Sequence, residues 1–520
     1  MTKDITIAIT GGTGHMGVQT VKKLLELPNI SKIKLLVRPE NKTLPKLLKF
    51  VGTERNRLEV VSGSLTNFHS LEKLVAGTQY VIHMAAVIPP LSDQNPQRSY
   101  EANEQGSHNM IKAIEAISEN QPKFIDITSV ALYGNRDEKH LWGRVGDPLL
   151  VSPFDVYSVN KLRGEFAVLE SKIQNWAILR QSAMIYRAMV DGNLSDGLIF
   201  HTTFNGPLEW VSDEDSGTLI KHIIEKDQTD DLSKVFWKRV FNIGAPAENR
   251  VTGFETLNEG FKLINGSTKD FFNPDFNITK NFHGLWYYDS DDLEKLFHYK
   301  SWKLNDYWSE IGKCHSYYKA AVVVPSVLIK KCAIERLFNN YNSPKYWFKH
   351  NDEAKLKAFF GGTEAYKALS TRTWEDFPLL CEGKKSDGSR INYEELKDIK
   401  NAQPLHAGFD FEKSDNEITL DDLKTAAEFR GGQCLSKEFT KGNLYAPVEW
   451  KTSDGEVFTA RPYTVLRAGH WYNPCYKEYV WDFNRLAKTN KFFAQVWYDT
   501  HSPDENECYY FDSAYKAHIR

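Results

Sequence analysis

This sequence contains few cysteines and has almost no excess of charge of either sign. Its six cysteines among 520 residues form no CxxC pair, so neither a disulfide framework nor a metal site is indicated. Lysine and arginine total 65 against 68 aspartate and glutamate residues, a formal charge of -3. Without a basic excess, we expect no nucleic-acid partner and favour a small-molecule substrate. A reducing cytoplasm is the expected location.

Apolar segments long enough to cross a membrane are also lacking. The start, MTKDITIAITGG, has no apolar stretch and cleavage site of a signal peptide. The most apolar later stretch, AAVVVPSVLI at residues 320–329, has about half the length of a membrane span and contains Pro325. We therefore expect a buried segment there, and no membrane partner.

The length of the chain predicts two or three domains, because single hydrophobic cores stop growing at roughly 250 to 300 residues. Short β-branched runs alternate with helical patterns over the first 312 residues, which predicts a Rossmann-type, doubly wound parallel α/β sheet with a small substrate subdomain. An aromatic-rich helical region is expected at 313–415, and a small α+β domain at 416–520. The strand candidates are ITIAIT, KIKLLV, LEVV, YVIHMA, FIDIT and WAILR.

A glycine-rich motif, TGGTGHMG at residues 10–17, lies between the first strand and a helical pattern. Its first glycine permits a tight turn, the second lets the backbone approach a pyrophosphate, and the third lets helix and strand pack closely. The motif therefore predicts a dinucleotide site. We expect cofactor contacts from Gly11, Thr13, Gly14, His15, Met16 and Gly17.

The second predicted strand, KIKLLV, ends at Arg38, where NAD-preferring proteins usually have an acid. An arginine there can pair with a 2′-phosphate, and Lys42 follows closely. We expect NADP(H) as the cofactor, with NAD(H) as the alternative.

A tyrosine and a lysine four residues apart, Tyr157 and Lys161, share one face of a predicted helix. The ammonium favours the phenolate, which suits a general acid and base near neutral pH. Ser129 ends the fifth predicted strand, at the sheet edge where open α/β folds bind ligands. These three residues are the predicted catalytic group.

Six motifs in order resemble the extended short-chain dehydrogenases/reductases over residues 5–311: TGGTGHMG, VIHMAA, NEQGSHN, ITSVALYG, YSVNK and ILRQ. The resemblance implies that Tyr157 exchanges the substrate proton and that Lys161 also holds the nicotinamide ribose. It implies that Ala85 and Ala86 line the cofactor groove and that Asn103 supports the site. It further implies a structural role for Asp215 and a homodimer formed through the helices that carry YxxxK.

Departures from the family pattern narrow the expected chemistry. Ser64 replaces an acid that often holds adenine. Val130 and Ala131 replace the Asp-Glu pair of sugar-nucleotide dehydratases, which argues against elimination of water. Ala183 replaces an asparagine common in sugar-nucleotide epimerases, which weakens that alternative.

The segment 431–475 resembles a treble-clef or zinc-ribbon-like repeat, but its metal ligands are degenerate. The corresponding positions are Thr452, Glu456, Tyr472 and Cys475, and structural zinc needs a nearly full set of thiolate or imidazole ligands. We therefore expect a module without metal, held together by aromatic packing.

The predicted function is that of an NAD(P)-dependent oxidoreductase that transfers a hydride between NADP(H) and a carbonyl or alcohol. Aromatic residues between 188 and 304 suit a hydrophobic aldehyde or ketone, although core packing explains them equally well. Two alternatives remain open: a sugar-nucleotide 4-epimerase that retains NAD, and a nucleotide-sensing scaffold or interaction protein.

Overall fold

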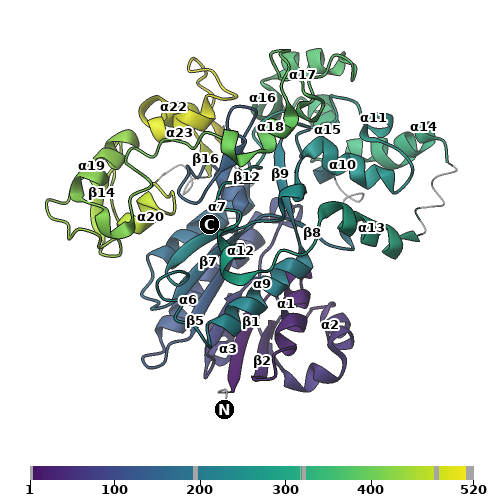
Figure 1. Cartoon of the computed structure of the whole chain (residues 1–520). Helices are drawn as coiled ribbons and strands as arrows, with labels where there is room; N and C mark the ends of the chain where they lie inside the picture. The colour runs from purple at the N-terminus through teal and green to yellow at the C-terminus, as the bar shows by residue number, and fades with distance from the viewer. Residues whose placement is uncertain (1–3, 191–196, 317, 319–323, 473–478, 511–520) are drawn as a thin grey trace.

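The centre of the molecule is a parallel β-sheet, shown in the computed structural model of Figure 1. The structure describes residues 4–190, 197–316, 318, 324–472 and 479–510. Within these ranges the sheet has the order β10-β7-β5-β4-β1-β2-β3. Its strands are β1 (Ile5–Thr10), β2 (Ile30–Val37), β3 (Leu58–Ser62), β4 (Tyr80–His83), β5 (Lys123–Ser129), β7 (Trp176–Gln181) and β10 (Arg239–Ile243).

Each of the six strand candidates forms one of these strands. The near-continuous burial of β1, β4, β5 and β7 is typical of a parallel sheet covered on both faces, whereas β2 and β3 are partly exposed. The edge strand β10 was missed. One face packs against α1 (His15–Leu25) and α9 (Asp213–Lys226), which contact each other. The other packs against α3 (Phe68–Val75), α6 (Gly106–Glu115) and α7 (Val156–Leu169). The predicted Rossmann-type, doubly wound fold is confirmed.

A smaller subdomain, formed mostly by residues after β7, adjoins the carboxyl ends of the parallel strands. In the described residues it contains a sheet of order β11-β9-β8 and a parallel pair, β6 with β12. The strands are β6 (Trp142–Gly143), β8 (Ala183–Ile185), β9 (Pro207–Ser212), β11 (Arg250–Thr252) and β12 (Trp286–Tyr287). The helices are α10 (Gly253–Lys262), α11 (Thr268–Phe271), α12 (Asp292–Phe297) and α13 (Leu304–Cys314).

The remaining chain lies above the sheet in Figure 1, at the end opposite the N-terminus. The helical region comprises α14 (Ser326–Ile329), α15 (Pro344–Lys349), α16 (Glu353–Phe360), α17 (Thr363–Ser370) and α18 (Tyr393–Lys397). The C-terminal helices are α19 (Leu420–Phe429), α20 (Pro462–Leu466), α22 (Phe483–Thr489) and α23 (Lys491–Trp497). The C-terminal strands are β13 (Gln433–Cys434), β14 (Val448–Lys451), β15 (Val457–Ala460), β16 (Val480–Trp481) and β17 (Tyr509–Tyr510).

Aromatic packing holds the predicted zinc-ribbon-like segment. Trp450 packs edge-on against Trp471 at 5.9 Å, and Tyr472 stacks on Phe458 at 5.4 Å between ring centroids. The backbone amide of Thr452 donates to the carbonyl of Glu456 in the turn between β14 and β15, whereas Cys475 lies outside the described residues. No group of three or more His, Cys, Asp or Glu that could hold a metal occurs in the described part of the chain. The resemblance itself stays a prediction.

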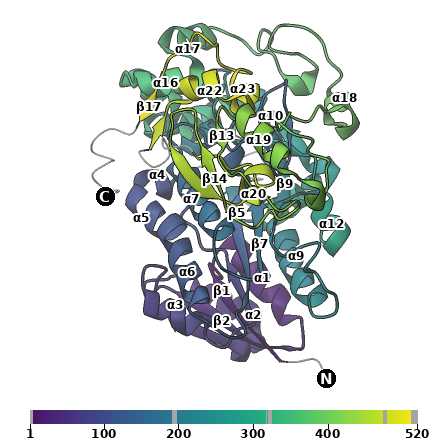
Figure 2. The ribbon, with the colours of Figure 1, turned by 90° about the vertical axis from the view of Figure 1, so that its left-hand side faces the viewer.

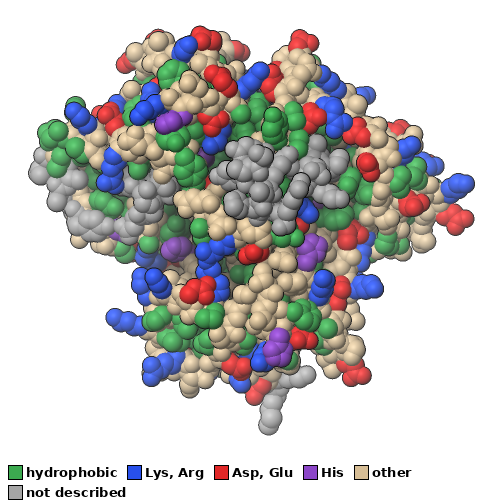
Figure 3. All heavy atoms as spheres, turned by 180° about the vertical axis from the view of Figure 1, so that it is seen from behind, with side chains coloured by type: hydrophobic (Ala, Val, Ile, Leu, Met, Phe, Trp, Pro, Cys, Tyr) green, Lys and Arg blue, Asp and Glu red, His purple; other side chains and the backbone are tan. Residues whose placement is uncertain are grey.

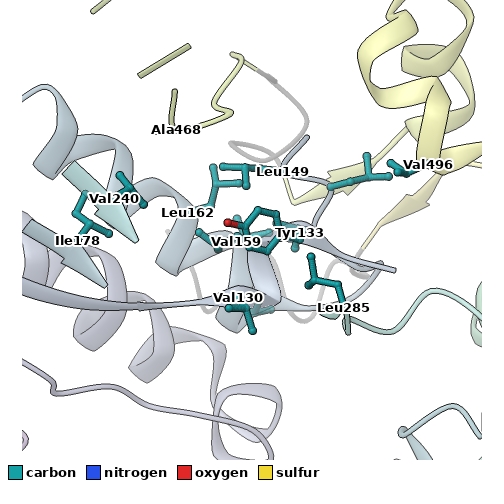
Figure 4. Close-up of a cluster of buried hydrophobic side chains, with 14 of the residues drawn as sticks. Val130, Tyr133, Leu149, Val159, Leu162, Ile178, Val240, Leu285, Ala468 and Val496 are labelled. Carbon is teal, nitrogen blue, oxygen red and sulfur yellow. The ribbon is translucent and has the colours of Figure 1, made fainter. Parts of the chain in front are cut away.

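Residues from all three predicted regions contribute to one hydrophobic cluster. Figure 4 shows Ala468 and Val496 of the C-terminal part near residues that belong to the sheet, α7 and the loops between them, such as Leu149 and Leu162. The proposed boundaries at 312 and 415 therefore separate segments that share a core. The boundaries remain predictions, based on where the amino-acid composition and the expected secondary structure change.

The surface carries basic and acidic side chains side by side, as Figure 3 shows for one face. The expectation of a buried segment at 320–329 was wrong for its described part. Val324, Val327 and Leu328 are 40%, 72% and 51% exposed. The four-residue helix α14 contacts α11, and among the described residues this packing leaves these side chains accessible. Among the described residues, no helix is long and apolar enough to cross a membrane.

Candidate active site

The glycine motif forms the turn between β1 and α1, and two of its glycines are required by close contacts. Gly11 has a φ of +74°, and a Cβ there would lie 2.7 Å from the backbone nitrogen of Ala85. A Cβ on Gly17 would overlap the carbonyl oxygen of Gly11. These positions allow β1, β4 and the start of α1 to meet closely.

A cavity of about 1480 Å³ opens over this turn at the carboxyl edge of the sheet. Seven of the predicted cofactor residues line it: Gly11, Thr13, Gly14, His15, Arg38, Ala85 and Ala86. Four others do not. Met16 is 7% exposed and packs into the core, Gly17 lies within the turn, and Tyr157 and Lys161 belong to α7.

The start of α1 fits a pyrophosphate. Its N-cap residue, Gly14, is exposed, makes no side-chain cap, and is followed by no acid in the first turn. The first amide N–H groups of a helix lack intrahelical acceptors and favour an anion. Ser64 and Thr66, whose hydroxyls hydrogen-bond each other at 2.9 Å, line the same cavity and supply uncharged polar groups where the family often has an acid.

Basic side chains line the part of the cavity beyond β2. Arg38 is half exposed and its Nε lies 3.4 Å from a carboxylate oxygen of Glu40. Lys42 is not among the lining residues, but Lys46, in α2 (Leu44–Val51), is. Lys46 was missed because its approach to the cavity depends on how α2 packs beside β2.

The side chain of His15 stacks on Tyr186, with ring centroids 3.8 Å apart. Tyr186 follows β8, and its neighbour Arg187, which lines the cavity, pairs with Glu214 of α9. Sequence reasoning missed this contact, because the two segments are remote along the chain and neither has a motif that points to the other.

The predicted acid and base, Tyr157, lies in the first turn of α7, which Asp155 caps by accepting the amide N–H of Ser158 at 2.9 Å. The side chain of Ser129, at the end of β5, lies close to that of Tyr157 and accepts the amide N–H of Ala131 at 3.1 Å. Burial raises the pKa of Tyr157 to about 12; the polar interaction with Ser129 lowers it and the charge of Asp155 raises it. The structure therefore brings the predicted serine and tyrosine together.

The predicted lysine, Lys161, lies one turn further along α7 and is 3% exposed. Its Nζ donates to the carbonyl oxygen of Ile127 on β5 at 3.0 Å. Burial lowers the pKa of Lys161, while the carboxylates of Asp126 and Glu165 raise it. Lys161 is thus fixed against the strand that ends in Ser129.

A buried ion pair joins α7 to β7. Arg180 of β7 donates to both carboxylate oxygens of Glu165 on α7, and Thr128 Oγ1 donates to the same carboxylate at 2.7 Å. Both members of the ion pair have fully buried side chains. Burial alone would raise the pKa of Glu165, but Arg180 and His470 together bring it down to about 2.

The C-terminal part of the chain contacts α7 directly, as Figure 2 illustrates. His470 Nε2 lies 2.9 Å from Glu165, and the hydroxyl of Tyr479 donates to Asn160 at 2.7 Å. Arg461 donates to the carbonyl oxygens of Leu169 and Ser171 at the end of the helix. No sequence motif indicated these contacts, because they join residues about 300 positions apart.

Two residues with implied supporting roles are hydrogen-bonded within the fold. Asn103 is buried and bridges both the N–H and the C=O of Val87, each at 2.8 Å, which fixes the strand exit that lines the cavity. Asp215 accepts from the amides of Ser301 and Trp302. Both contacts are with backbone groups.

Three of the four positions that depart from the family pattern have apolar side chains. Val130 and Ala131 are buried directly after Ser129, and Ala183 lies in β8. Trp286 and Tyr287 of the aromatic segment are at most 1% exposed, so they belong to the core.

Comparison with known proteins agrees with the resemblance over the first third of the chain. Residues 7–182 match the NAD dependent epimerase/dehydratase family. The matched region includes the glycine turn, Ser129, Tyr157 and Lys161. It thus contains the cavity wall at β1 and the predicted catalytic group.

Several known proteins are similar to parts of the chain. It is 26% identical to human (Homo sapiens) 3 beta-hydroxysteroid dehydrogenase type 7 over 170 residues, covering 31% of this chain and 43% of that protein. It is 29% identical to UDP-glucose 4-epimerase of Rickettsia massiliae over 135 residues, covering 25% and 38%. The chain thus spans less than half the length of these curated relatives. A solved dTDP-glucose 4,6-dehydratase from Bacillus anthracis, in complex with NAD, has 16% identity and a TM-score of 0.47, covering 61% of this chain and 98% of that one.

Proposed function

We propose that this protein is an NAD(P)-dependent oxidoreductase that transfers a hydride between NADP(H) and a carbonyl or alcohol. The observation that carries the proposal is the proximity of Ser129 and Tyr157, whose side chains interact at the carboxyl edge of the sheet, with Lys161 one helical turn away. A binding module without chemistry has no need of this arrangement. Its place on the same sheet edge as the glycine turn supports a reaction at a bound nicotinamide.

The proposed roles follow from the positions of the three side chains. Ser129 orients the substrate oxygen through its hydroxyl, and Tyr157 gives that oxygen its proton during reduction or takes it during oxidation. Because burial raises the pKa of Tyr157 to about 12, the neutral phenol is the resting form near pH 7. The buried charge of Lys161 lowers the cost of the phenolate that remains after proton donation. The nicotinamide, when bound, supplies or accepts the hydride.

The dinucleotide would be held along the cavity. The amides at the start of α1 would bind the pyrophosphate, Ala85 and Ala86 would border the groove, and Lys161 would also bind the ribose. Arg38 and Lys46 supply positive charge where a 2′-phosphate would lie, which supports NADP(H) over NAD(H).

A hydrophobic aldehyde or ketone is the proposed substrate. Aromatic rings surround the first turn of α7: Phe154 packs on Phe359 at 6.2 Å and on Trp481 at 6.0 Å. Phe282 stacks on His283, whose Nδ1 is 3.9 Å from Asp155. Phe154, Phe282 and His283 are half buried, so this aromatic group is not fully enclosed in the core.

A sugar-nucleotide 4-epimerase with retained NAD is the second candidate, favoured by the similarity to UDP-glucose 4-epimerase. It differs in a property that can be measured directly, because its hydride returns to the substrate. Purified protein would then contain NAD and would consume no NADPH.

Variants of Tyr157 test the proposal. Tyr157→Phe should bind NADPH as the wild type does, by nicotinamide fluorescence, but lose at least 100-fold in aldehyde reduction, the low end of general acid catalysis. The control is Tyr346→Phe, which removes a phenol hydroxyl in α15, remote from α7 along the chain. Full turnover by Tyr157→Phe would exclude this proton donor, and copurified NAD without net NADPH oxidation would favour the epimerase.

A further inference from the structure

Besides Glu165, a second carboxylate, that of Asp126, lies near the proposed catalytic lysine, Lys161. Asp126 is in the middle of β5, 1% exposed, one residue before the Ile127 carbonyl that accepts Lys161. In the sheet it is paired in register with His83 of β4, which is paired in turn with Thr10 of β1. Neighbouring residues in register project to the same face of a parallel sheet. Asp126 and His83 therefore face the layer that contains α7.

His83 shares one hydrogen bond with Thr10. Thr10 Oγ1 accepts the amide N–H of Ala85 at 3.2 Å and lies 2.8 Å from His83 Nδ1, where its hydroxyl can serve as donor or as acceptor. Burial, with the charge of Lys161, lowers the pKa of His83 to about 3, so the ring is neutral.

Two polar atoms on this face lack partners. Among the described residues, neither His83 Nε2 nor Asp126 Oδ1 has a hydrogen-bond partner, and both are buried. Buried polar atoms without partners are uncommon in folded proteins and call for an explanation.

The charges around Asp126 do not balance without it. The groups facing Asp126 are His83 on β4, and Lys161 and Glu165 on α7. Glu165 is in turn contacted by Arg180 on β7 and by His470 of the C-terminal part. Arg180, Thr128 and His470 already hold the Glu165 carboxylate, and His83 is neutral. Two buried cations, Lys161 and Arg180, are then balanced by a single carboxylate, that of Glu165, which is already hydrogen-bonded. An ionised Asp126 restores neutrality, and an uncompensated buried charge is costly.

We propose that Asp126 is a positioning residue that keeps Lys161 protonated against β5, and thereby sets the state in which Lys161 assists Tyr157. The inference rests on the proposed function of Lys161, but its first measurable consequence is the proton affinity of the lysine itself. It assigns to Asp126 a role in the site without contact to substrate or cofactor.

The pH dependence follows from the sign of each interaction. Burial raises the pKa of Asp126 to about 7; Lys161 lowers it and Glu165 raises it. Above that pH, Asp126 is ionised and increases the proton affinity of Lys161. Without this carboxylate, Lys161 loses its proton at a lower pH, and any turnover that needs the ammonium declines at a lower pH on the alkaline side.

The test is a titration of full-length protein with ¹³C at the lysine Cε positions, followed by NMR. The Lys161 resonance is assigned by its absence in Lys161→Arg. In Asp126→Asn, its titration midpoint should fall by about one pH unit or more, the effect of one nearby opposite charge. Asp227→Asn is the matched control. It neutralises a different buried aspartate, which pairs with Lys123 at 2.6 Å, and should leave the titration midpoint of Lys161 unchanged.

A measurement on the wild type covers the case in which Asp126→Asn fails to fold. The Lys161 resonance should then show a second inflection near pH 7, from ionisation of Asp126. A Lys161 midpoint equal in wild type and Asp126→Asn, or a wild-type curve without that inflection, would overturn the proposal.

Turnover separates this inference from the proposed function. If the protein reduces a carbonyl, the alkaline limb of its pH–rate profile should shift in Asp126→Asn in parallel with the NMR midpoint. A shifted Lys161 midpoint in a protein without any hydride transfer would uphold the interaction and refute the oxidoreductase. An unshifted rate profile beside a shifted midpoint would refute the role in catalysis.

Discussion

Replacing Glu165 by glutamine is expected to destabilise the protein by about 3–5 kcal/mol, the usual cost of removing one partner from a buried ion pair. The side chains of Glu165 and Arg180 are both 0% exposed, and Nη2 lies 2.5 Å from Oε1. An amide gives the guanidinium one neutral oxygen in place of a charged carboxylate. His470 and Thr128 also lose their charged acceptor.

The same pair predicts a pH dependence with a definite sign. The pKa of Glu165 is about 2 in the folded protein against 4.5 for a free glutamate. Its contribution is complete above about pH 4.5 and is lost as the pH falls towards 2. A depression of this size corresponds to roughly 3 kcal/mol, at about 1.4 kcal/mol per pH unit. Glu165→Gln should lose this part of the acid dependence.

Denaturant unfolding at pH 7, 5 and 3, followed by tryptophan fluorescence, measures both effects. Glu364→Gln is the control, because Glu364 pairs with Lys367 at 2.7 Å on the surface, where such pairs contribute about 0–1 kcal/mol. If Glu165→Gln were no less stable than Glu364→Gln at pH 7, the account of a buried, net-stabilising pair would be refuted.

Three further variants test other contacts. Gly17→Ala should abolish NADPH binding, measured by fluorescence, because its Cβ would overlap the Gly11 carbonyl. The control, Gly260→Ala in α10, makes only ordinary contacts, so it should bind NADPH normally and gain up to about 1 kcal/mol in unfolding free energy. His470→Ala should lose about 1–3 kcal/mol, since Glu165 loses a buried donor; wild-type stability in denaturant would contradict this. Burial lowers the pKa of His501 to about 3, so between pH 6.5 and 3 this histidine takes up a proton only in the unfolded chain, and stability should decline over that range. His501→Gln should flatten this decline in the unfolding midpoint.

Local sequence patterns predicted the parallel-sheet part of the chain well. A buried parallel strand needs a continuous β-branched run, and a glycine turn needs its spacing whatever surrounds it. The six strand candidates and the glycine turn were therefore visible in the chain itself. The edge strand β10, RVFNI, was missed because it is short and mixed in polarity.

Tertiary packing alone decided which side chains share an environment. The sequence placed Tyr157 and Lys161 on one helical face, but only the assembled fold brings His470 to Glu165 and exposes Val327 at the rim. Asp126 occupies an apparently ordinary strand position, and its neighbours come from another strand and a helix. Short-range patterns depend on backbone geometry, whereas burial, proton affinity and partners depend on distances between segments that no local pattern encodes.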